Sequence, residues 1–345
     1  MQSFVRTVKY YFRKSLFYRL FLIGKEQSTR HSFKKYYPNQ ILLRCKALAV
    51  YLLYGIRAKE FLRFRLDEKP LRESRKYVDY IECRFLYHIF NSVKVRRILS
   101  DKFASYQILS EFYKRNMTLI DVEDINSGIM KDRVIEFMGR GNPTIVFKPR
   151  RSYSGNGVGV YDNVEEICEL LTINKGGCLE SLIVQREELA GFNASSVNTI
   201  RINTVNYGEG DVEVVWPSFR MGRVGSFVDN AGCGGVFGAI DVETGVVIGA
   251  ADEYRNRYTE HPDSHKRIIG FVVPEWHEAC NIVKQMAMKL PDAAFVGWDL
   301  ALTKEGWVLV EGNGAPLIIW QMASGIGIRN KFNEIENKLM SKKKL

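Results

Sequence analysis

Residues 295–313 read FVGWDLALTKEGWVLVEGN, and this stretch decides the fold. Two apolar runs rich in β-branched residues flank the turn KEG at 304–306, so the pattern predicts a β-hairpin. In such a hairpin, Asp299 and Glu311 stand near each other at one end. Both carboxylates lie between apolar residues, where a carboxylate without a partner costs several kcal/mol. We therefore expect both to have partners.

Two kinds of partner would satisfy this pair of carboxylates. Asp299, Glu311 and the amide of Asn313 supply the oxygen ligands that Mg²⁺ prefers, with waters and phosphate oxygens completing its shell. The alternative is that each carboxylate forms a salt bridge with an arginine of the body, such as Arg201 or Arg220. The hairpin thus predicts either a magnesium site or a buried ion pair.

A glycine-rich segment lies far before the hairpin in the sequence. Residues 144–147 predict a strand that delivers Lys148, and the sequence RRSYSGNGVGV follows at 150–160. Its glycines let backbone N–H groups approach a phosphate closely. The segment is neither a P-loop nor a dinucleotide fingerprint, because it lacks Gly-Lys-Ser/Thr and does not open a helix. A structural hairpin is the alternative, but the lysine favours a phosphate ligand.

The charge of the chain is concentrated in its first third. The net charge is +11, yet residues 1–100 hold 23 basic and 7 acidic side chains, and the remainder is slightly acidic. Residues 4–24 predict a basic amphipathic helix, which either packs on its own domain or lies on an anionic membrane surface. We expect no nucleic-acid partner, because no recognisable binding motif accompanies the charge. An anionic glycan precursor is a further candidate partner for this basic region.

The fold class follows from a change in the pattern of apolar residues along the chain. Residues 40–112 keep helical spacing of apolar positions, whereas short β-branched runs bounded by turns appear after residue 118. We expect strands at 144–147, 157–161, 182–185, 198–205, 212–216, 235–241, 245–250, 294–303 and 307–311, and helices at 164–172 and 274–290. The pattern predicts an α+β body behind a basic, mainly helical front third.

No apolar run reaches the roughly 18 residues that a membrane span needs, and the N-terminal sequence is not typical of a signal peptide. We therefore expect a cytoplasmic protein, which would lie at the inner face of the membrane if residues 4–24 bind lipid.

The glycine-rich segment and the hairpin, in this order, resemble the ATP-grasp superfamily, whose members bind ATP between two α+β lobes. The resemblance implies ATP and Mg²⁺ as cofactors. Together with the charge and residue pattern, the resemblance predicts four regions: a basic helical N-terminal region (1–99), a first lobe with the lysine and glycine-rich loop (100–187), a second lobe with the metal site (188–330) and a basic C-terminal tail (331–345).

The resemblance assigns roles to individual residues of this sequence. Lys102 and Lys148 would contact the phosphates, and Asp299, Glu311 and Asn313 would be the magnesium ligands. The remaining nucleotide-binding residues would be Ser154, Gly155, Gly157 and Gly159 in the lid, and Val184, Gln185 and Glu188 at the adenine and ribose.

A narrower resemblance is to the sugar-transfer-associated ATP-grasp group. It rests on the sequences SSVNTIR at 195–201, FRMG at 219–222, VDN at 228–230, HPD at 261–263 and GWD at 297–299. The resemblance implies a role in the assembly of capsule, O-antigen or exopolysaccharide. The front third departs from the α/β domain that precedes the ATP-binding lobes in well-studied ligases of the superfamily, so the identity of their substrates does not carry over.

In the usual reaction of the superfamily, a carboxylate attacks the γ-phosphate of ATP, and an amine captures the acylphosphate as an amide. Arg201 and Arg220 are candidates to stabilise the acylphosphate, with structural pairing to a carboxylate as the alternative. His261 would contact substrate or act on the amine, unless it is a solvated loop histidine. The hydroxyl groups of a sugar would suit Asn198, Asp229 and Asn230, although a plain loop also explains the last two.

Three hypotheses for the function follow. The first is a carboxylate–amine ligase that acts on a small-molecule or nucleotide-linked sugar acid and an amine. The second keeps the ATP site but transfers the phosphoryl group to a sugar or glycan precursor. The third is a non-catalytic scaffold at the membrane surface, against which the intact lysine and carboxylate motifs argue.

Overall fold

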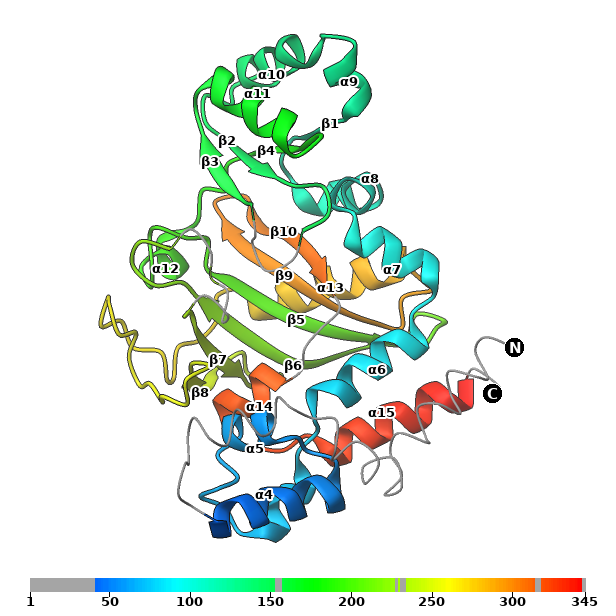
Figure 1. Ribbon diagram of the computed structural model, residues 1–345, viewed down its shortest axis with the longest axis vertical. Coiled ribbons are helices and arrows are strands. Elements are labelled where there is room, and N and C mark those ends of the chain that lie inside the picture. The colour runs from blue at the N-terminus through cyan, green and yellow to red at the C-terminus, as the bar shows by residue number, and fades with distance from the viewer. Residues whose placement is uncertain (1–40, 153–156, 227–228, 230–233, 314–317, 343–345) are drawn as a thin grey trace.

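The computed structural model describes residues 41–152, 157–226, 229, 234–313 and 318–342 (Figure 1). Within them the chain forms a four-stranded sheet and a six-stranded sheet, both antiparallel throughout, with helices packed around them. This arrangement confirms the predicted α+β class. The predicted amphipathic helix at residues 4–24 lies outside the described residues.

The small sheet forms the first lobe, at the top of Figure 1. Its strand order is β1-β4-β2-β3, and α10 and α11 pack on one of its faces. Along β2, Ile145 and Phe147 are buried in the core of this lobe, while Val146 and Lys148 alternate to the opposite face. Its elements are β1 (Met117–Ile120), α9 (Val122–Asn126), α10 (Met130–Gly139), β2 (Ile145–Lys148), β3 (Gly159–Tyr161), α11 (Val164–Ile173) and β4 (Gly177–Ser181).

The large sheet forms the second lobe, and its strand order is β10-β9-β5-β6-β7-β8. Figure 1 shows α13 behind this sheet. Every residue of β5 and β9 is buried, because these central strands are covered on both faces. The elements of this lobe are α12 (Glu187–Ala190), β5 (Thr199–Asn206), β6 (Val212–Met221), β7 (Val236–Ile240), β8 (Val247–Ala251), α13 (Trp276–Lys289), β9 (Phe295–Thr303) and β10 (Gly306–Asn313).

The N-terminal helices share their core with the large sheet. Phe61 and Phe64 pack with Phe237 of β7 and Met322 of α14, so this region is not a separate body. The boundary predicted at residue 100 falls where α7 ends and α8 begins. These elements are α4 (Ile41–Tyr54), α5 (Ala58–Arg63), the 3₁₀ helix η1 (Leu71–Lys76), α6 (Tyr80–Phe90), α7 (Val93–Ser100) and α8 (Lys102–Tyr113), joined by α14 (Ile318–Ser324) and α15 (Arg329–Lys342) from the other end of the chain.

The strand predicted at 182–185 is wrong. The fourth strand of the small sheet, β4, ends at Ser181, and Leu182 and Val184 are exposed in a linker rather than paired in a sheet. Gln185 makes only an isolated bridge to Thr303. The apolar, β-branched composition of this segment therefore does not reflect burial in a core strand. Among the described helices, none is long and apolar enough to cross a membrane.

Candidate active site

One cavity of about 1440 Å³ brings together all three parts of the molecule. The small sheet contributes Lys148 and Glu180, and the large sheet contributes Arg201, Asp299 and Glu311. The linker at 182–185 and the helices α5, α6 and α7 complete the walls. Residues that the sequence separates by more than a hundred positions therefore face the same space.

Lys148 is held in place by a buried carboxylate. Its Nζ lies 2.9 Å from Oε2 of Glu180, and Nη2 of Arg115 lies 2.7 Å from the same oxygen. Glu180 is 2% exposed. Burial alone raises the pKa of this carboxyl, but Lys148 and Arg115 outweigh burial and hold it below its ordinary value. The side chain of Lys148 is therefore fixed on the cavity wall by this carboxylate.

Lys102, the second predicted phosphate lysine, begins α8 beside the glycine-rich segment. Its Nζ donates hydrogen bonds to the carbonyl and hydroxyl oxygens of Ser152, at 3.2 and 3.0 Å. Burial lowers its pKa below the ordinary value; the charge of Glu311 opposes this shift, and that of Lys148 adds to it. Asp101 caps α8 and pairs with Arg150, so the helix is anchored to the same segment.

The glycine-rich segment is only partly described. Gly159 lines the cavity. Gly157 has a φ of +74°, and a Cβ atom there would meet Pro149 at 2.8 Å, so a side chain would be strained. Ser154 and Gly155 lie outside the described residues.

The predicted hairpin is present, and its register places Glu311 directly opposite Asp299. A β-bulge between Leu309 and Glu311 shifts the pairing at this point. The side-chain amide of Asn313 contacts both carboxylates, at 2.7 Å from Oε1 of Glu311 and 3.1 Å from Oδ2 of Asp299. The two carboxylates and the amide therefore converge, as the sequence predicts.

Asp299 also has the partners that the alternative interpretation requires. It is 1% exposed, and Nε of Arg201 and Nη1 of Arg220 donate to its oxygens at 2.6 and 2.8 Å. Burial raises the pKa of this carboxyl, but the two guanidinium groups outweigh burial and hold it below its ordinary value. Asp299 is thus an anion neutralised by arginines.

The donor set fits a divalent cation through Glu311 and Asn313. Among the described residues Glu311 has no ion pair. Rotation of the side-chain amide of Asn313 by half a turn would direct its oxygen toward the ion. Asp299 would reach the same ion only by giving up a bond to an arginine. No three His, Cys, Asp or Glu side chains of the described residues form a metal cluster, so the set rests on carboxylates plus an amide.

Arg220 connects Asp299 to a second carboxylate, Asp229. Its Nη2 lies 2.9 Å from Oδ1 of Asp229, whose other oxygen accepts from the backbone N–H of Thr199 at 3.1 Å. Burial raises the pKa of Asp229, and the nearby Asp299 adds to this although Arg220 opposes it. Arg220, Asp229 and Asp299 all line the cavity. Asn230 lies outside the described residues.

The predicted adenine and ribose residues lie in different surroundings. Val184 is 67% exposed and lines the cavity. The side-chain oxygen of Gln185 accepts from the backbone N–H of Asn198 at 3.0 Å, which fixes the linker on the second lobe. Glu188 pairs with Arg186 and is not on the cavity wall.

Two predicted substrate residues have structural contacts instead. Asn198 is buried and donates to the carbonyl oxygens of Leu189 and Asn193 at 2.9 and 2.8 Å. His261 is buried, and its Nε2 lies 2.9 Å from the carbonyl oxygen of Gly222. Burial lowers its pKa. Neither side chain lines the cavity, and His261 is not the solvated loop histidine of the alternative.

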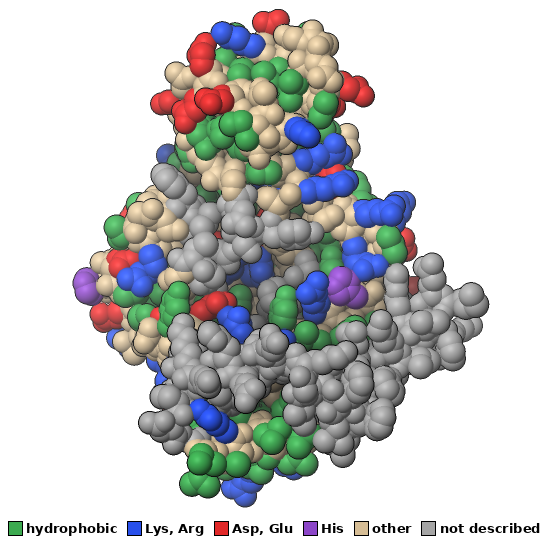
Figure 2. All heavy atoms as spheres, in the orientation of Figure 1, with side chains coloured by type: hydrophobic (Ala, Val, Ile, Leu, Met, Phe, Trp, Pro, Cys, Tyr) green, Lys and Arg blue, Asp and Glu red, His purple; other side chains and the backbone are tan. Residues whose placement is uncertain are grey.

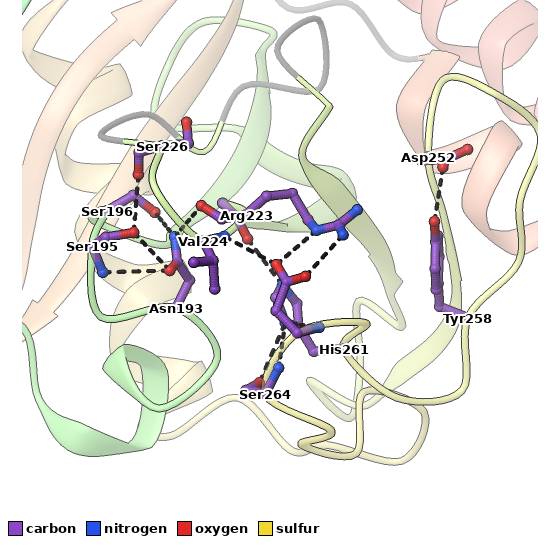
Figure 3. Close-up of polar contacts among 12 residues, drawn as sticks. Asn193, Ser195, Ser196, Arg223, Val224, Ser226, Asp252, Tyr258, His261 and Ser264 are labelled. Atoms are coloured by element: carbon purple, nitrogen blue, oxygen red, sulfur yellow. Dashed lines mark hydrogen bonds and ion pairs between the residues drawn. The ribbon is translucent and has the colours of Figure 1, made fainter.

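Figure 3 shows the polar contacts around His261. It lies beside Arg223 and Ser264, near a network that includes Asn193 and Ser195. Arg223 pairs with Asp263 at 2.7 Å, next to this histidine in the sequence. Asn193 donates to the carbonyl oxygen of Arg223 at 3.2 Å, which fixes the end of β6 against the loop before β5, and that loop lines the cavity from Ala194 to Val197.

The position of the N-terminal helices at this cavity was not predicted from the sequence. Arg57 and Arg63 of the α5 region line it, as do Arg84 of α6 and Arg96 and Arg97 of α7. Their signal in the sequence was the basic excess of residues 1–100. Its connection to the site was missing because only the packing of α6 and α7 against the large sheet brings these side chains there.

Two lobes built on antiparallel sheets face one cavity, with Lys148 from the first lobe, Lys102 from the start of α8 and a Glu-x-Asn sequence from the second lobe. This arrangement defines the class of ATP-grasp proteins. More narrowly, the chain belongs to the sugar-transfer associated ATP-grasp family, whose model matches residues 83–337. Both resemblances seen in the sequence are thereby confirmed. No curated protein matches the sequence.

Solved structures with a similar arrangement share little sequence with this chain. D-alanyl-alanine synthetase A from Vibrio cholerae O1 biovar eltor has 12% identity and a TM-score of 0.45, over 73% of this chain and 68% of its own. The D-alanine-D-alanine ligase from Coxiella burnetii has 10% identity and a TM-score of 0.47, over 76% and 66%. The ATP-grasp ligase PsnB, complexed with its minimal precursor, Mg and ADP, has 11% identity and a TM-score of 0.43, over 80% and 72%.

Proposed function

We propose that the protein is an ATP- and Mg²⁺-dependent ligase that joins a carboxylate to an amine through an acylphosphate. The observation that carries the proposal is the meeting of Lys102 and Lys148 with Glu311 and Asn313 around one cavity. Lys148 from the first lobe and Lys102 from the start of α8 thus face oxygen ligands from the second lobe. This is the charge pattern that a bound triphosphate with its metal requires.

In this proposal the residues of the chain act mainly by charge. Lys148 and Lys102 bind the phosphate oxygens and reduce their repulsion with the incoming carboxylate. Magnesium, held by Glu311 and Asn313 and reached by Asp299 after an exchange of one arginine bond, would neutralise charge on the transferring phosphoryl group. The linker at 182–185 would receive the adenine, with Val184 exposed toward it.

The proposed bond changes balance without an additional reactant. A substrate carboxylate oxygen attacks the γ-phosphorus, the bond to the bridging oxygen breaks, and ADP leaves. The amine then attacks the carbonyl carbon, inorganic phosphate leaves, and one proton is released. Arg201 and Arg220 lie on the cavity wall, where they would stabilise the developing negative charge while Asp299 and Asp229 hold them in position.

We further propose a sugar acid or nucleotide-linked glycan precursor as the carboxylate substrate, in capsule, O-antigen or exopolysaccharide assembly. The support is the family to which the chain belongs, which is described as sugar-transfer associated. Residues 4–24 would hold the protein at the inner face of the membrane, and the support for this is their basic, amphipathic sequence alone.

The test is a screen for ADP and phosphate release with a panel of uronates and amines, followed by mass spectrometry of the products. We expect release that depends on both the uronate and the amine, together with an amide product. Lys131→Ala serves as a control variant, because this lysine is exposed and pairs with Glu165 outside the cavity. A stable phosphorylated product formed without any amine would replace the ligase by a phosphotransferase.

A further inference from the structure

Three arginines and a lysine line the cavity on the side of the N-terminal helices. Lys59 comes from α5, Arg84 from α6, and Arg96 and Arg97 from α7. We call these four residues the arginine wall. Figure 2 shows Lys and Arg side chains gathered on this side of the molecule, where Figure 1 places α7 and α8.

No carboxylate of the described residues forms an ion pair with the arginine wall. The two acidic side chains on this side of the cavity pair elsewhere, Glu60 with Arg57 at 3.0 Å and Glu253 with Arg63 at 2.7 Å. Positive charges that line a cavity without acidic partners repel one another and attract an anion. Unlike the charges of a salt-bridged surface, the charges of the arginine wall are therefore not neutralised by carboxylates of the described residues.

The hydrogen bonds within the arginine wall also favour an anionic ligand. Nη1 of Arg96 lies 2.7 Å from Nδ1 of His88, and Nε of Arg84 lies 3.4 Å from Nε2 of the same ring. Guanidinium groups only donate, and a histidine ring offers one acceptor nitrogen at most. The ring can thus satisfy only one of the two arginines, and Nε of Arg96 is buried with no hydrogen-bond partner among the residues that the structure describes.

The arginine wall lies apart from the expected place of the nucleotide. In Figure 1, α12 follows the linker that would receive the adenine, and it lies on the opposite side of β9 and β10 from α7. The phosphates of ATP would lie between these positions, at Lys148 and Glu311. The wall thus faces the end of the cavity that the nucleotide leaves to the second substrate.

We propose that the arginine wall binds a phosphate group of the acceptor substrate. This inference rests on the proposed function and deepens it, because the acceptor then carries a phosphate or diphosphate in addition to the carboxylate that reacts. Several guanidinium groups suit a phosphate better than a lone carboxylate, since phosphate bears more charge and offers oxygens for two-pronged contacts. The phosphate anchors one end of the acceptor while its carboxylate reaches the γ-phosphate.

The experiment is calorimetric titration of the purified full chain in the presence of saturating ADP and Mg²⁺, which fill the nucleotide site. Glucose 1-phosphate supplies a phosphate alone, glucuronate a carboxylate alone, and UDP-glucuronate a diphosphate with a carboxylate. Each probe is titrated into the wild type and into the triple variant Arg84→Gln/Arg96→Gln/Arg97→Gln. Arg140→Gln is the matched control, since this arginine is exposed on the first lobe and pairs with Glu136.

We expect at least one phosphorylated probe to bind the wild type and to lose about tenfold or more in affinity in the triple variant, with ADP affinity unchanged. Comparing glucose 1-phosphate with UDP-glucuronate distinguishes a sugar phosphate from a nucleotide-linked sugar. Arg97→Gln alone, at an exposed position, should show a smaller loss in the same direction if the triple variant does not fold.

Equal binding of the phosphorylated probes to the wild type and the variants would overturn the inference. So would failure of both to bind a wild type that binds ADP, or a wall-dependent binding of glucuronate alone. Failure of ADP itself to bind would contradict the proposed function instead, and titrations without nucleotide would then still decide whether the wall takes phosphate.

Discussion

The two sides of the cavity treat charge in opposite ways. On the sheets, Asp299 is neutralised by Arg201 and Arg220, and Glu180 by Lys148 and Arg115. On the helices, the arginine wall has no acidic partners among the described residues. Paired charges hold a geometry before any ligand arrives, whereas charges without partners gain their counter-ions from the ligand. The paired charges on the sheets thus hold the side chains of the site in position, whereas the arginine wall on the helices is available to bind a ligand.

Asp299→Asn is the substitution that should disturb this comparison most. It keeps the shape of the side chain but removes the carboxylate partner of the buried Arg201 and one of the two carboxylate partners of Arg220, so we expect the free energy of unfolding to fall by about 3–5 kcal/mol. Urea denaturation followed by circular dichroism measures the change. Asp211→Asn is the control, because Asp211 is an exposed partner of Lys338 and should cost less than about 1 kcal/mol. Equal effects of the two substitutions would mean that the buried pair is not structural.

Lys148→Ala tests the role of a paired residue in chemistry rather than in stability. Glu180 keeps Arg115 as a partner, so we expect a folded protein. ATP turnover should fall by about 100- to 1000-fold, the usual loss when one group that stabilises transferring charge is removed. The measurement is ADP release at saturating Mg²⁺, with Lys131→Ala alongside. Normal turnover in Lys148→Ala would remove this lysine from the site.

Glu311→Gln distinguishes the two carboxylates of the hairpin. Glu311 has no ion pair in the described structure, so its loss should leave the free energy of unfolding almost unchanged. The concentration of Mg²⁺ needed for half-maximal turnover should rise by roughly 10- to 100-fold, because a charged oxygen ligand is replaced by a neutral one. A titration with Mg²⁺ at fixed ATP gives this value. An unchanged curve would place the metal elsewhere.

The local features of the site were predictable because they are short-range. The alternation of Ile145 and Phe147 with Val146 and Lys148 fixes which residues of β2 face the cavity. The turn at 304–306 sets the register as far as Leu309, and the β-bulge that follows brings Glu311 opposite Asp299. Strand alternation and hairpin register are both encoded within about ten residues.

The features that were missed depend on contacts between distant segments. Residues 182–185 have the composition of a strand, but β1 and β2 already flank β4, and the segment is left as a linker. The burial of His261 depends on Gly222, which lies far from it in the sequence. The place of Arg84 and Arg96 on the cavity follows from helix packing, for which periodicity gives a face but not a partner.

Glu60 is one of the two acidic side chains on the helix side of the cavity, and it makes stability depend on pH. It is 1% exposed, and burial together with Asp79 raises its pKa from 4.5 to about 7, although Arg57 and Arg63 oppose the shift. Between these pH values the folded state holds a proton that the unfolded state has released, so stability falls as pH rises. The slope is at most about 1.4 kcal/mol per pH unit.

The free energy of unfolding of Glu60→Gln should therefore depend less on pH than that of the wild type between pH 4.5 and about 7. Above that range the two should change with pH in parallel. Denaturation curves at several pH values measure the difference. Glu68→Gln is the control, because Glu68 is an exposed partner of Arg65. A wild type and Glu60→Gln that respond identically to pH would mean that Glu60 is ionised throughout.

Arg97→Gln should have the smallest effect on stability, and for that reason it sharpens the comparison. Arg97 is exposed on α7 and has no carboxylate partner within the part of the chain that the structure describes, so its removal leaves no described buried charge uncompensated. It also relieves repulsion from the neighbouring Arg96. We expect a change in the free energy of unfolding within about 0.5 kcal/mol, measured under the same conditions as for Asp299→Asn. A large loss would show that Arg97 is paired in the folded protein, and the helix side of the cavity would then be held by its own charges in the same way as the sheet side.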